Sequence, residues 1–311
     1  MKNKRCWSVA FVVLASFVLD GGCTSLSRLD PKTEEPVIRA HDATAQRKLD
    51  ALLTLRTQLP PGPPPPADWV GKTLSVASAA NLPMLWIAPG TFTMGDANDG
   101  PAHLVHLTRG YWLGRTEVTQ VQWQAVMGNN PSNNEFKGPN QPVENVSWDD
   151  AMEFCRRVTA SERTASHVPP GYEYTLPTEA EWEYACRAGT TGDYGGDGNL
   201  DHMGWYDGNS RGKTHDVASK APNAWGLYDM HGNVWEWCYD LASSYTNNEQ
   251  TDPASLGVEP DNTSDSGSGR VNRGGSWVNT AVNCQSTYRS GGGSGYHGDG
   301  LGFRLALSPV R

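Results

Sequence analysis

The fold of this chain is decided by residues 232–237 (GNVWEW), 273–277 (RGGSW) and 302–304 (GFR). Each segment joins glycine, which tolerates backbone conformations closed to other residues, to aromatic or arginine side chains. We expect Trp235 and Trp237 to fill the core and the RGGSW segment to shape a buried turn. The stretch between the second and third segments is then a long loop between fixed turns.

Composition bounds the remaining choices. The chain has 311 residues, 37% of them hydrophobic, with 12 Trp, which is ample for a packed globular core. Its 34 Gly and 21 Pro indicate many turns and long connections. A formal net charge of -9, with no cluster of Lys or Arg, argues against a nucleic-acid partner. Composition alone therefore predicts a mixed, loop-rich α+β protein.

The N-terminus has the pattern of an export signal. Lys2 and Arg5 precede a nearly unbroken apolar stretch over residues 7–19, which is too short to span a membrane comfortably. Small residues lead to Cys23, as in a bacterial lipoprotein signal, although Asp20 stands where an apolar residue is usual. We predict a signal peptide over 1–23 with a lipid anchor, with simple export into the periplasm or medium as the alternative.

Residues 24–68 are expected to form a tether. Leucines among good helix formers predict a short amphipathic helix over 41–59. The proline run at 60–66 must end this helix and make a stiff, extended spacer. The globular domain is then expected over 69–311.

Three helices within the domain can be located from capping boxes, in which a Ser or Thr side chain and a residue three positions later satisfy each other's backbone amides. The pairs are Thr119 with Gln122, Ser147 with Asp150, and Thr178 with Glu181. Short strands are expected at 85–88 and 111–113. His103 and His106 also fit a strand, which would point them to opposite faces and argues against a shared metal site.

The motifs together make the chain resemble the sulfatase-modifying-factor family, also called the formylglycine-generating enzyme family. The resemblance runs from about Met84 to Leu307 and implies a loop-rich variant of the C-type-lectin fold. The segments that carry it are 116–119 (TEVT), 142–148 (PVENVSW), 176–184 (LPTEAEWEY), 232–237, 273–277 and 302–304.

One segment of this pattern suggests a structural calcium ion. Asp229 and Glu236, with Gly232 between them, can supply carboxylate and carbonyl oxygens to a hard cation. The family resemblance implies Asp229 and Glu236 as side-chain ligands and Gly232 and Val234 as main-chain ligands. The alternative is that both carboxylates cap turn amides.

Copper is expected only if the chain is an oxidase. Oxygen activation at a cuprous ion needs soft thiolate ligands, and the family's enzymes carry a cysteine pair shortly after the RGGSW segment. Counted without gaps, the two positions fall on Asn279 and Cys284; with a shorter loop, Cys284 also falls outside them. Ser276, whose family counterpart lies beside the oxygen position, is present. Either alignment removes the copper pair.

The disulfide pattern stays open. The resemblance implies that Cys155 and Cys186 would pair with cysteines near the C-terminus, but at least the partner of Cys155 is absent. Cys284 could pair with Cys238 or Cys186, and export would permit this. Alternatively, all four are buried thiols that behave as small hydrophobic side chains.

The stretch 278–301 is rich in Gly and Ser with occasional larger side chains, which makes an adaptable binding surface. A relative of this domain, the variable protein of diversity-generating retroelements, displays mutable residues in this window; the alternative is an ordinary surface loop. The candidate binding residues are Val278, Asn279, Val282, Ser290, Tyr296, His297 and Asp299.

The sequence thus predicts an exported, non-catalytic module that binds a protein or glycan through these loops. The competing hypothesis is a formylglycine-generating oxidase that converts a Cys or Ser of a sulfatase polypeptide, with Ser276 and Cys284 at its site.

Overall fold

The computed structural model describes residues 64–65, 67–96, 100–255 and 269–311. All of them belong to one compact unit, Pro60–Arg311. The predicted signal peptide, the lipid-bearing cysteine and the helix of the tether lie outside the described residues. No helix in the described part of the chain is long and apolar enough to cross a membrane.

The largest sheet has five antiparallel strands, which bring the two ends of the domain together. Its strands in spatial order are β1 (Leu74–Val76), β2 (Leu82–Ile87), β5 (Tyr111–Gly114), β12 (Ala306–Pro309) and β6 (Tyr172–Thr175). The predicted strands at 85–88 and 111–113 are therefore confirmed as parts of β2 and β5.

This sheet is buried on both faces, as the alternation of its side chains shows. On β5, Trp112 belongs to one apolar cluster, whereas its neighbours Tyr111 and Leu113 belong to a second cluster. On β12, Leu307 and Ala306 divide in the same way. Successive residues of a strand point to opposite faces, so central strands that are apolar throughout require a covering layer on each side.

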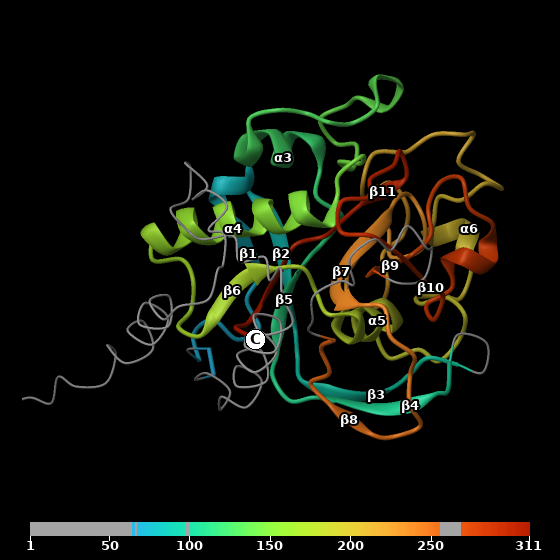
Figure 1. The fold of residues 1–311 in the computed structure, drawn as a ribbon, viewed down its shortest axis with the longest axis horizontal. Coiled ribbons are helices and arrows are strands. Elements are labelled where there is room, and N and C mark those ends of the chain that lie inside the picture. The colour runs from blue at the N-terminus through green and yellow to red at the C-terminus, as the bar shows by residue number, and fades with distance from the viewer. Residues whose placement is uncertain (1–63, 66, 97–99, 256–268) are drawn as a thin grey trace, which may run out of the picture. The chain divides into compact units, whose positions relative to one another are not determined.

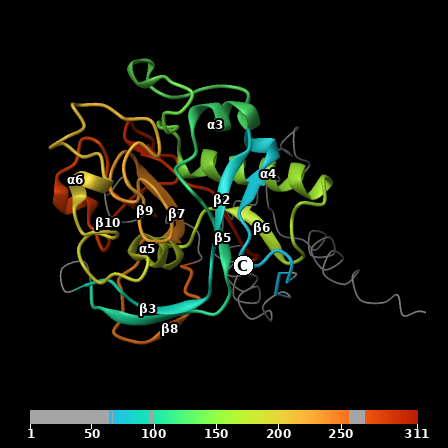
Figure 2. The ribbon, with the colours of Figure 1, turned by 180° about the vertical axis from the view of Figure 1, so that it is seen from behind.

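Helices supply one of these layers. The helices are α3 (Gln120–Met127), α4 (Trp148–Thr164), α5 (Glu179–Arg187) and the short α6 (Leu200–Met203), with 3-10 turns η1 (Ala77–Ala79), η2 (Asn134–Phe136) and η3 (Ala281–Cys284). The three predicted capping boxes are all present, and they begin α3, α4 and α5. Figure 1 shows α3 and α4 together on one side of the five-stranded sheet. In the reverse view of Figure 2, β2 passes in front of α4.

Two smaller sheets complete the domain. The four-stranded sheet has the order β10 (Arg289–Gly292), β9 (Arg270–Arg273), β7 (Trp235–Leu241) and β11 (Leu301–Gly302), and the three-stranded sheet has the order β3 (Gly90–Met94), β4 (His103–Leu107) and β8 (Gln250–Thr251). Helix α5 packs against β3, β7 and β9, so it lies between these two sheets. His103 and His106 lie on β4, as predicted.

Candidate functional site

The four-stranded sheet carries a hollow of about 710 Å³, which we call the C-terminal hollow. Each strand of the sheet contributes to its floor: Trp235 from β7, Asn272 from β9, Ser290 from β10 and Leu301 from β11. Ser290 is paired with Asn272, and Leu301 with Trp235, so the floor is held by strand pairing. The remaining lining residues come from the end of β10 and from the loops after β9 and β10: Ser276, Val278, Asn279, Gly291, Gly292, Gly293, Tyr296, Gly298, Asp299 and Gly300.

The rim of the hollow is exposed and almost uncharged. The side chains of Val278 and Tyr296 are 58% and 61% exposed, so large apolar groups face solvent there. Asp299 is the sole charged residue among those that line the hollow. Small residues with a few exposed aromatic and aliphatic side chains form a surface suited to recognition.

Hydrogen bonds inside the hollow fix Asn279. Its side-chain oxygen accepts a hydrogen bond from the Trp235 indole at 2.8 Å and another from the Ser276 hydroxyl. The position that the gapless count assigns to a copper ligand is thus filled by a carboxamide whose oxygen already has two donors.

The outer wall of the hollow, at Gly298 and Asp299, is hydrogen-bonded to the loop before α4. The Asp299 carboxylate accepts a hydrogen bond from Asn133 at 3.0 Å, and the Asn145 amide donates to the Gly298 carbonyl, also at 3.0 Å. Burial, together with the charge of Asp299, raises the pKa of the nearby Glu144 to about 7, although a hydrogen bond from the Asn133 amide acts in the opposite direction.

A fully buried arginine, Arg273, anchors the hollow from below. Its guanidinium donates to the carbonyls of Ser286 at 3.0 Å and Tyr288 at 2.7 Å, which lead into β10. The same group pairs with Glu183 and, at 3.2 Å, with Glu179, both on α5. A buried guanidinium must have such partners, because an unpaired charge in the core is strongly destabilising. The arginine of RGGSW therefore holds the floor of the hollow to α5.

The glycines of the same segment explain why Cys284 lies outside the hollow. Gly275 has φ +73°, and a Cβ on it would lie 2.6 Å from the Cys284 sulfur. The chain therefore turns closely over the thiol, which is buried and does not line the hollow. The predicted buried turn is confirmed.

The thiol chemistry does not fit a copper site. Burial raises the pKa of Cys284 to about 12, so at neutral pH the sulfur stays protonated, whereas copper needs the thiolate. Cys155, Cys186, Cys238 and Cys284 are all free and buried. The suggested pairing of Cys284 with Cys238 or Cys186 is therefore wrong, and the alternative of four buried thiols is confirmed. No cysteine is among the residues that line the hollow.

The predicted calcium ligands lie in the core beneath the five-stranded sheet. Both carboxylate oxygens of Glu236 lie 2.6 Å from nitrogens of Arg304, and one of them also accepts the Trp182 indole N–H at 2.8 Å. A guanidinium that binds both oxygens competes with any cation for Glu236. Asp229 accepts a hydrogen bond from the Ala218 amide at 2.7 Å, as the alternative of turn capping expected.

A second buried acid, Glu117, lies close enough for its charge to interact with that of Asp229. Neither carboxylate oxygen of Glu117, nor Oδ1 of Asp229, meets an N–H or O–H donor among the described residues. Burial raises the pKa of Glu117 well above its usual value and that of Asp229 to about 6, and the charge of each carboxylate disfavours ionisation of its neighbours. Among the described residues, no group of three or more His, Cys, Asp or Glu could hold a metal ion. The calcium set Asp229, Gly232, Val234 and Glu236 stays a prediction, in which a cation would have to compete with Arg304 for Glu236.

The structure gathers most of the predicted binding residues. Five of the seven line the C-terminal hollow, and Ser276 joins them; the exceptions are Val282, exposed on η3, and His297, whose ring hydrogen-bonds to Asn145 at 2.9 Å. Sequence reasoning missed two of the lining residues: Trp235 was expected in the core, and no strand was predicted around Asn272. The available signal at Asn272 was a polar side chain just before the RGGSW segment.

Comparison with known proteins agrees with this geometry. A family model described as "Sulfatase-modifying factor enzyme 1-like domain" matches residues 73–309. Chaperone protein LppX of Paenibacillus barcinonensis is 31% identical over 246 residues, which cover 65% of this chain and 80% of that protein. The formylglycine-generating enzyme of Streptomyces coelicolor is 31% identical over 256 residues, covering 74% of this chain and 68% of that enzyme.

A solved structure is also similar. Treponema denticola variable protein 1 superposes with a TM-score of 0.67 at 33% identity, over 76% of this chain and 99% of that one. With the small helix content and the three separate sheets described above, this match confirms the predicted α+β, C-type-lectin-like fold class.

Proposed function

Because the chain belongs to the sulfatase-modifying factor enzyme 1-like family, we propose that it is a non-catalytic member that binds a polypeptide partner in the C-terminal hollow. One observation carries this proposal. The hollow is lined by Ser276 and Asn279, but Cys284 is buried beneath Gly275 and presents no thiolate to it. Hydroxyl and amide groups thus stand at the position where the family's enzymes are expected to perform oxidation.

The build of the hollow supports a binding role. Its floor is a paired sheet anchored by the buried Arg273, whereas its rim bears the exposed side chains of Val278 and Tyr296. A rigid floor that carries exposed side chains favours recognition, because little conformational entropy is lost on binding. The rim residues also carry little of the protein's stability, so they can differ without loss of the fold.

A polypeptide is favoured over a glycan as the partner. One relative is named a chaperone protein and another a formylglycine-generating enzyme. A protein substrate is also what the family resemblance implies for the enzymes. The rim, which bears exposed Tyr296 and Val278 and a single charged residue, Asp299, suits an apolar peptide segment. Binding of a glycan and not of a polypeptide would contradict this part of the proposal.

Export is part of the same proposal. The positive start, the apolar stretch over 7–19 and Cys23 support an exported, lipid-anchored protein that acts on other exported chains. Metabolic labelling with a clickable fatty acid tests the anchor: label is expected on the wild type and not on Cys23→Ser. Label on neither form would leave simple export.

The oxidase remains the second candidate, because one relative is a formylglycine-generating enzyme. A sulfatase peptide containing Cys-X-Pro-X-Arg, incubated with the protein, copper and a reductant, separates the two functions by mass spectrometry. We expect the cysteine to stay unchanged. Conversion to the aldehyde would overturn the non-catalytic proposal.

Binding is tested by photocrosslinking from two matched positions. Tyr296 and Val282 are 61% and 57% exposed, but only Tyr296 lines the hollow. A photoreactive phenylalanine analogue at 296 is expected to form adducts with exported polypeptides, and the same analogue at 282 is not. The adducts at 296 should disappear when Asn279→Arg fills the hollow. Equal adducts at both positions, or none at 296, would contradict the proposal.

A further inference from the structure

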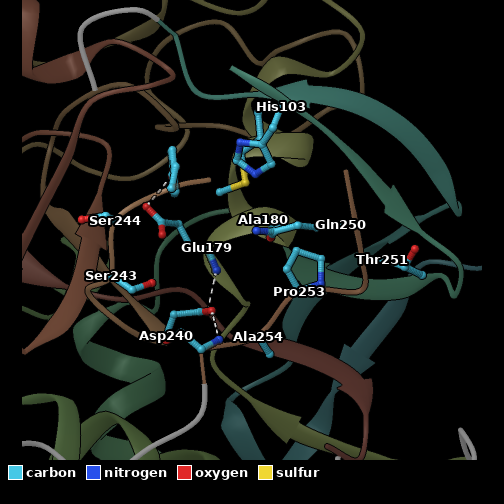
Figure 3. A pocket seen from close by; sticks show the side chains of 13 residues that line it. His103, Glu179, Ala180, Asp240, Ser243, Ser244, Gln250, Thr251, Pro253 and Ala254 are labelled. Atoms are coloured by element: carbon cyan, nitrogen blue, oxygen red, sulfur yellow. Dashed lines mark hydrogen bonds between the residues drawn. The ribbon is translucent and has the colours of Figure 1, made fainter. Parts of the chain in front are cut away.

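A second cavity lies beside the three-stranded sheet. It has a volume of about 400 Å³ and is formed where β4, the start of α5 and the segment 243–255 meet; we call it the β8 pocket. None of its lining residues lines the C-terminal hollow. Figure 3 shows His103 at the top of the pocket and Asp240 at the bottom, with Glu179 and Gln250 between them.

His103 contributes a buried hydrogen-bond acceptor to this pocket. The residue is 4% exposed, and its Nδ1 lies 3.0 Å from the Pro101 carbonyl. A carbonyl oxygen only accepts, so in the neutral ring Nδ1 carries the proton and Nε2 presents a lone pair. Nε2 is buried and has no hydrogen-bond partner among the described residues. Such an atom is costly to bury unless a donor reaches it.

The Tyr245 ring holds His103 in this orientation. The two rings meet edge to face at 5.1 Å, and the Tyr245 hydroxyl donates to Glu179 at 2.9 Å. The other charge near Tyr245, Arg289, lies 4.2 Å from its ring centre. The ring is thus packed on several sides, so the imidazole cannot easily turn Nε2 elsewhere, and Tyr245 offers no open face for stacking a ligand.

The charge of the pocket favours a cation. The charged side chains that line it are the carboxylates of Glu179 and Asp240, and no Lys or Arg is among the lining residues. Glu179 is already compensated by Arg289 and Arg273. An anion would therefore meet negative charge without a neighbouring cation in the lining.

Asp240 is the carboxylate that a ligand could still use. Its two oxygens accept hydrogen bonds from the backbone amides of Glu179 at 2.8 Å and Ser255 at 2.6 Å, and each oxygen keeps a second lone pair. Arg311, whose charge also reaches Asp240, is paired with Glu181. Burial raises the pKa of Asp240 to about 7, and a cation beside it would favour the ionised form.

We propose that the β8 pocket binds a compact organic cation with N–H donors, such as a primary ammonium group, between the His103 Nε2 acceptor and the Asp240 carboxylate. A bare metal ion is a poorer match, since no group of three or more ligating side chains exists among the described residues. The hydroxyls of Ser243, Ser244 and Thr251 on the pocket wall can take up further polar groups of the same ligand. This site is separate from the proposed function and does not depend on it.

The test uses three probes with the same four-carbon skeleton on the whole chain. Calorimetric titration with 1,4-diaminobutane is expected to show saturable binding, whereas 1,4-butanediol and succinate are expected to show none. His103→Phe keeps the ring but removes the acceptor, and Asp240→Asn removes the charge. Each should weaken diaminobutane binding at least about tenfold, the effect of one lost charge-assisted hydrogen bond. His106→Phe, on the opposite face of β4, is the matched control and should bind normally.

A second readout guards against variants that fail to fold. In the wild-type protein, the ¹⁵N resonance of His103 Nε2 should shift on titration with diaminobutane, while that of His106 should not. A lysine derivative blocked at both its amino and carboxyl ends distinguishes a side chain of a partner protein from a free amine. Equal binding of the diol, unchanged affinity in both variants, or an unmoved His103 resonance would overturn the proposal.

Discussion

The C-terminal hollow is built on the four-stranded sheet and the β8 pocket beside the three-stranded sheet, and their linings are built differently. The hollow presents Val278 and Tyr296 to solvent from loops, with paired strands beneath. The β8 pocket presents His103 and Asp240, which are 4% and 5% exposed and are fixed by backbone groups. In the hollow, recognition can change without cost to the fold, whereas in the pocket the same side chains serve both binding and stability.

Arg273 joins the two regions, so its loss should have the largest effect. Arg273→Met would leave Glu183 with Arg187 as its remaining guanidinium partner and free the carbonyls of Ser286 and Tyr288. We expect a loss of about 3–5 kcal/mol in the free energy of unfolding, measured with urea. Arg156→Met, on a half-exposed pair of α4, is the control and should cost less than about 1 kcal/mol. Similar losses in both variants would refute the role of Arg273.

The turn over Cys284 should be the next most sensitive point. Gly275→Ala forces a side chain into φ +73° and against the Cys284 sulfur, and we expect destabilisation of about 2–4 kcal/mol in thermal or urea unfolding. Gly295→Ala, whose Cβ would meet nothing within 4 Å, is the matched control within the hollow's own loop and should change stability by less than about 0.5 kcal/mol. A tolerated Gly275→Ala would show that the turn is not closely packed.

Each region has one carboxyl with a raised pKa, which gives a pH test. The pKa of Glu144, beside the hollow, is raised to about 7, and that of Asp240 also to about 7. A raised folded pKa means that the folded state binds more protons, so the free energy of unfolding should fall as pH rises from about 5 to 8. The fall then levels off above the folded pKa.

Substitutions should separate the two contributions. Glu144→Gln keeps the oxygen that accepts the Asn133 amide and should reduce the pH-dependent loss by about 1–3 kcal/mol. Asp240→Asn should also flatten the curve but lower stability at all pH values, because both Asp240 oxygens accept backbone amides. A pH profile unchanged by Glu144→Gln would contradict the raised pKa of Glu144.

The smallest effect on stability is expected at the rim. Tyr296→Ala removes a side chain that is 61% exposed and should change the free energy of unfolding by less than about 0.5 kcal/mol. Capture of a polypeptide by the hollow should nevertheless fall sharply in a pull-down with a crosslinked partner. Strong destabilisation by Tyr296→Ala would show that the exposed rim of the hollow also contributes to the stability of the fold.

Calcium removal should have no measurable effect. Since Arg304 binds both oxygens of Glu236, we expect the same midpoint of thermal unfolding in calcium and in a chelator. A rise in the midpoint with calcium, lost in Asp229→Ala, would restore the calcium site that the sequence predicted.

Much of the fold could be predicted from local patterns. The capping boxes at Thr119, Ser147 and Thr178 begin helices because their hydrogen bonds are satisfied within four residues. The close turn at Gly275 was also predictable from its local sequence, RGGSW. The sulfur against which it packs, that of Cys284, was not predictable.

Long-range pairing explains what the sequence did not reveal. Glu236 looked like a metal ligand because its partner, Arg304, stands 68 residues away in the chain. Trp235 and Asn272 line the hollow because they pair with Leu301 and Ser290 on neighbouring strands. No local sequence pattern predicts this pairing. The His103 acceptor likewise depends on how Pro101 and Tyr245 meet its ring.

The most direct test of the central claim, that the hollow binds a partner without copper chemistry, is copper(I) affinity by competition with a chromophoric chelator. Wild type, Cys284→Ser and the control Cys155→Ser should all bind copper(I) weakly and alike, because each thiol is buried and protonated. Tight binding of one copper(I) per chain that is lost in Cys284→Ser but kept in Cys155→Ser would contradict the account and favour an oxidase.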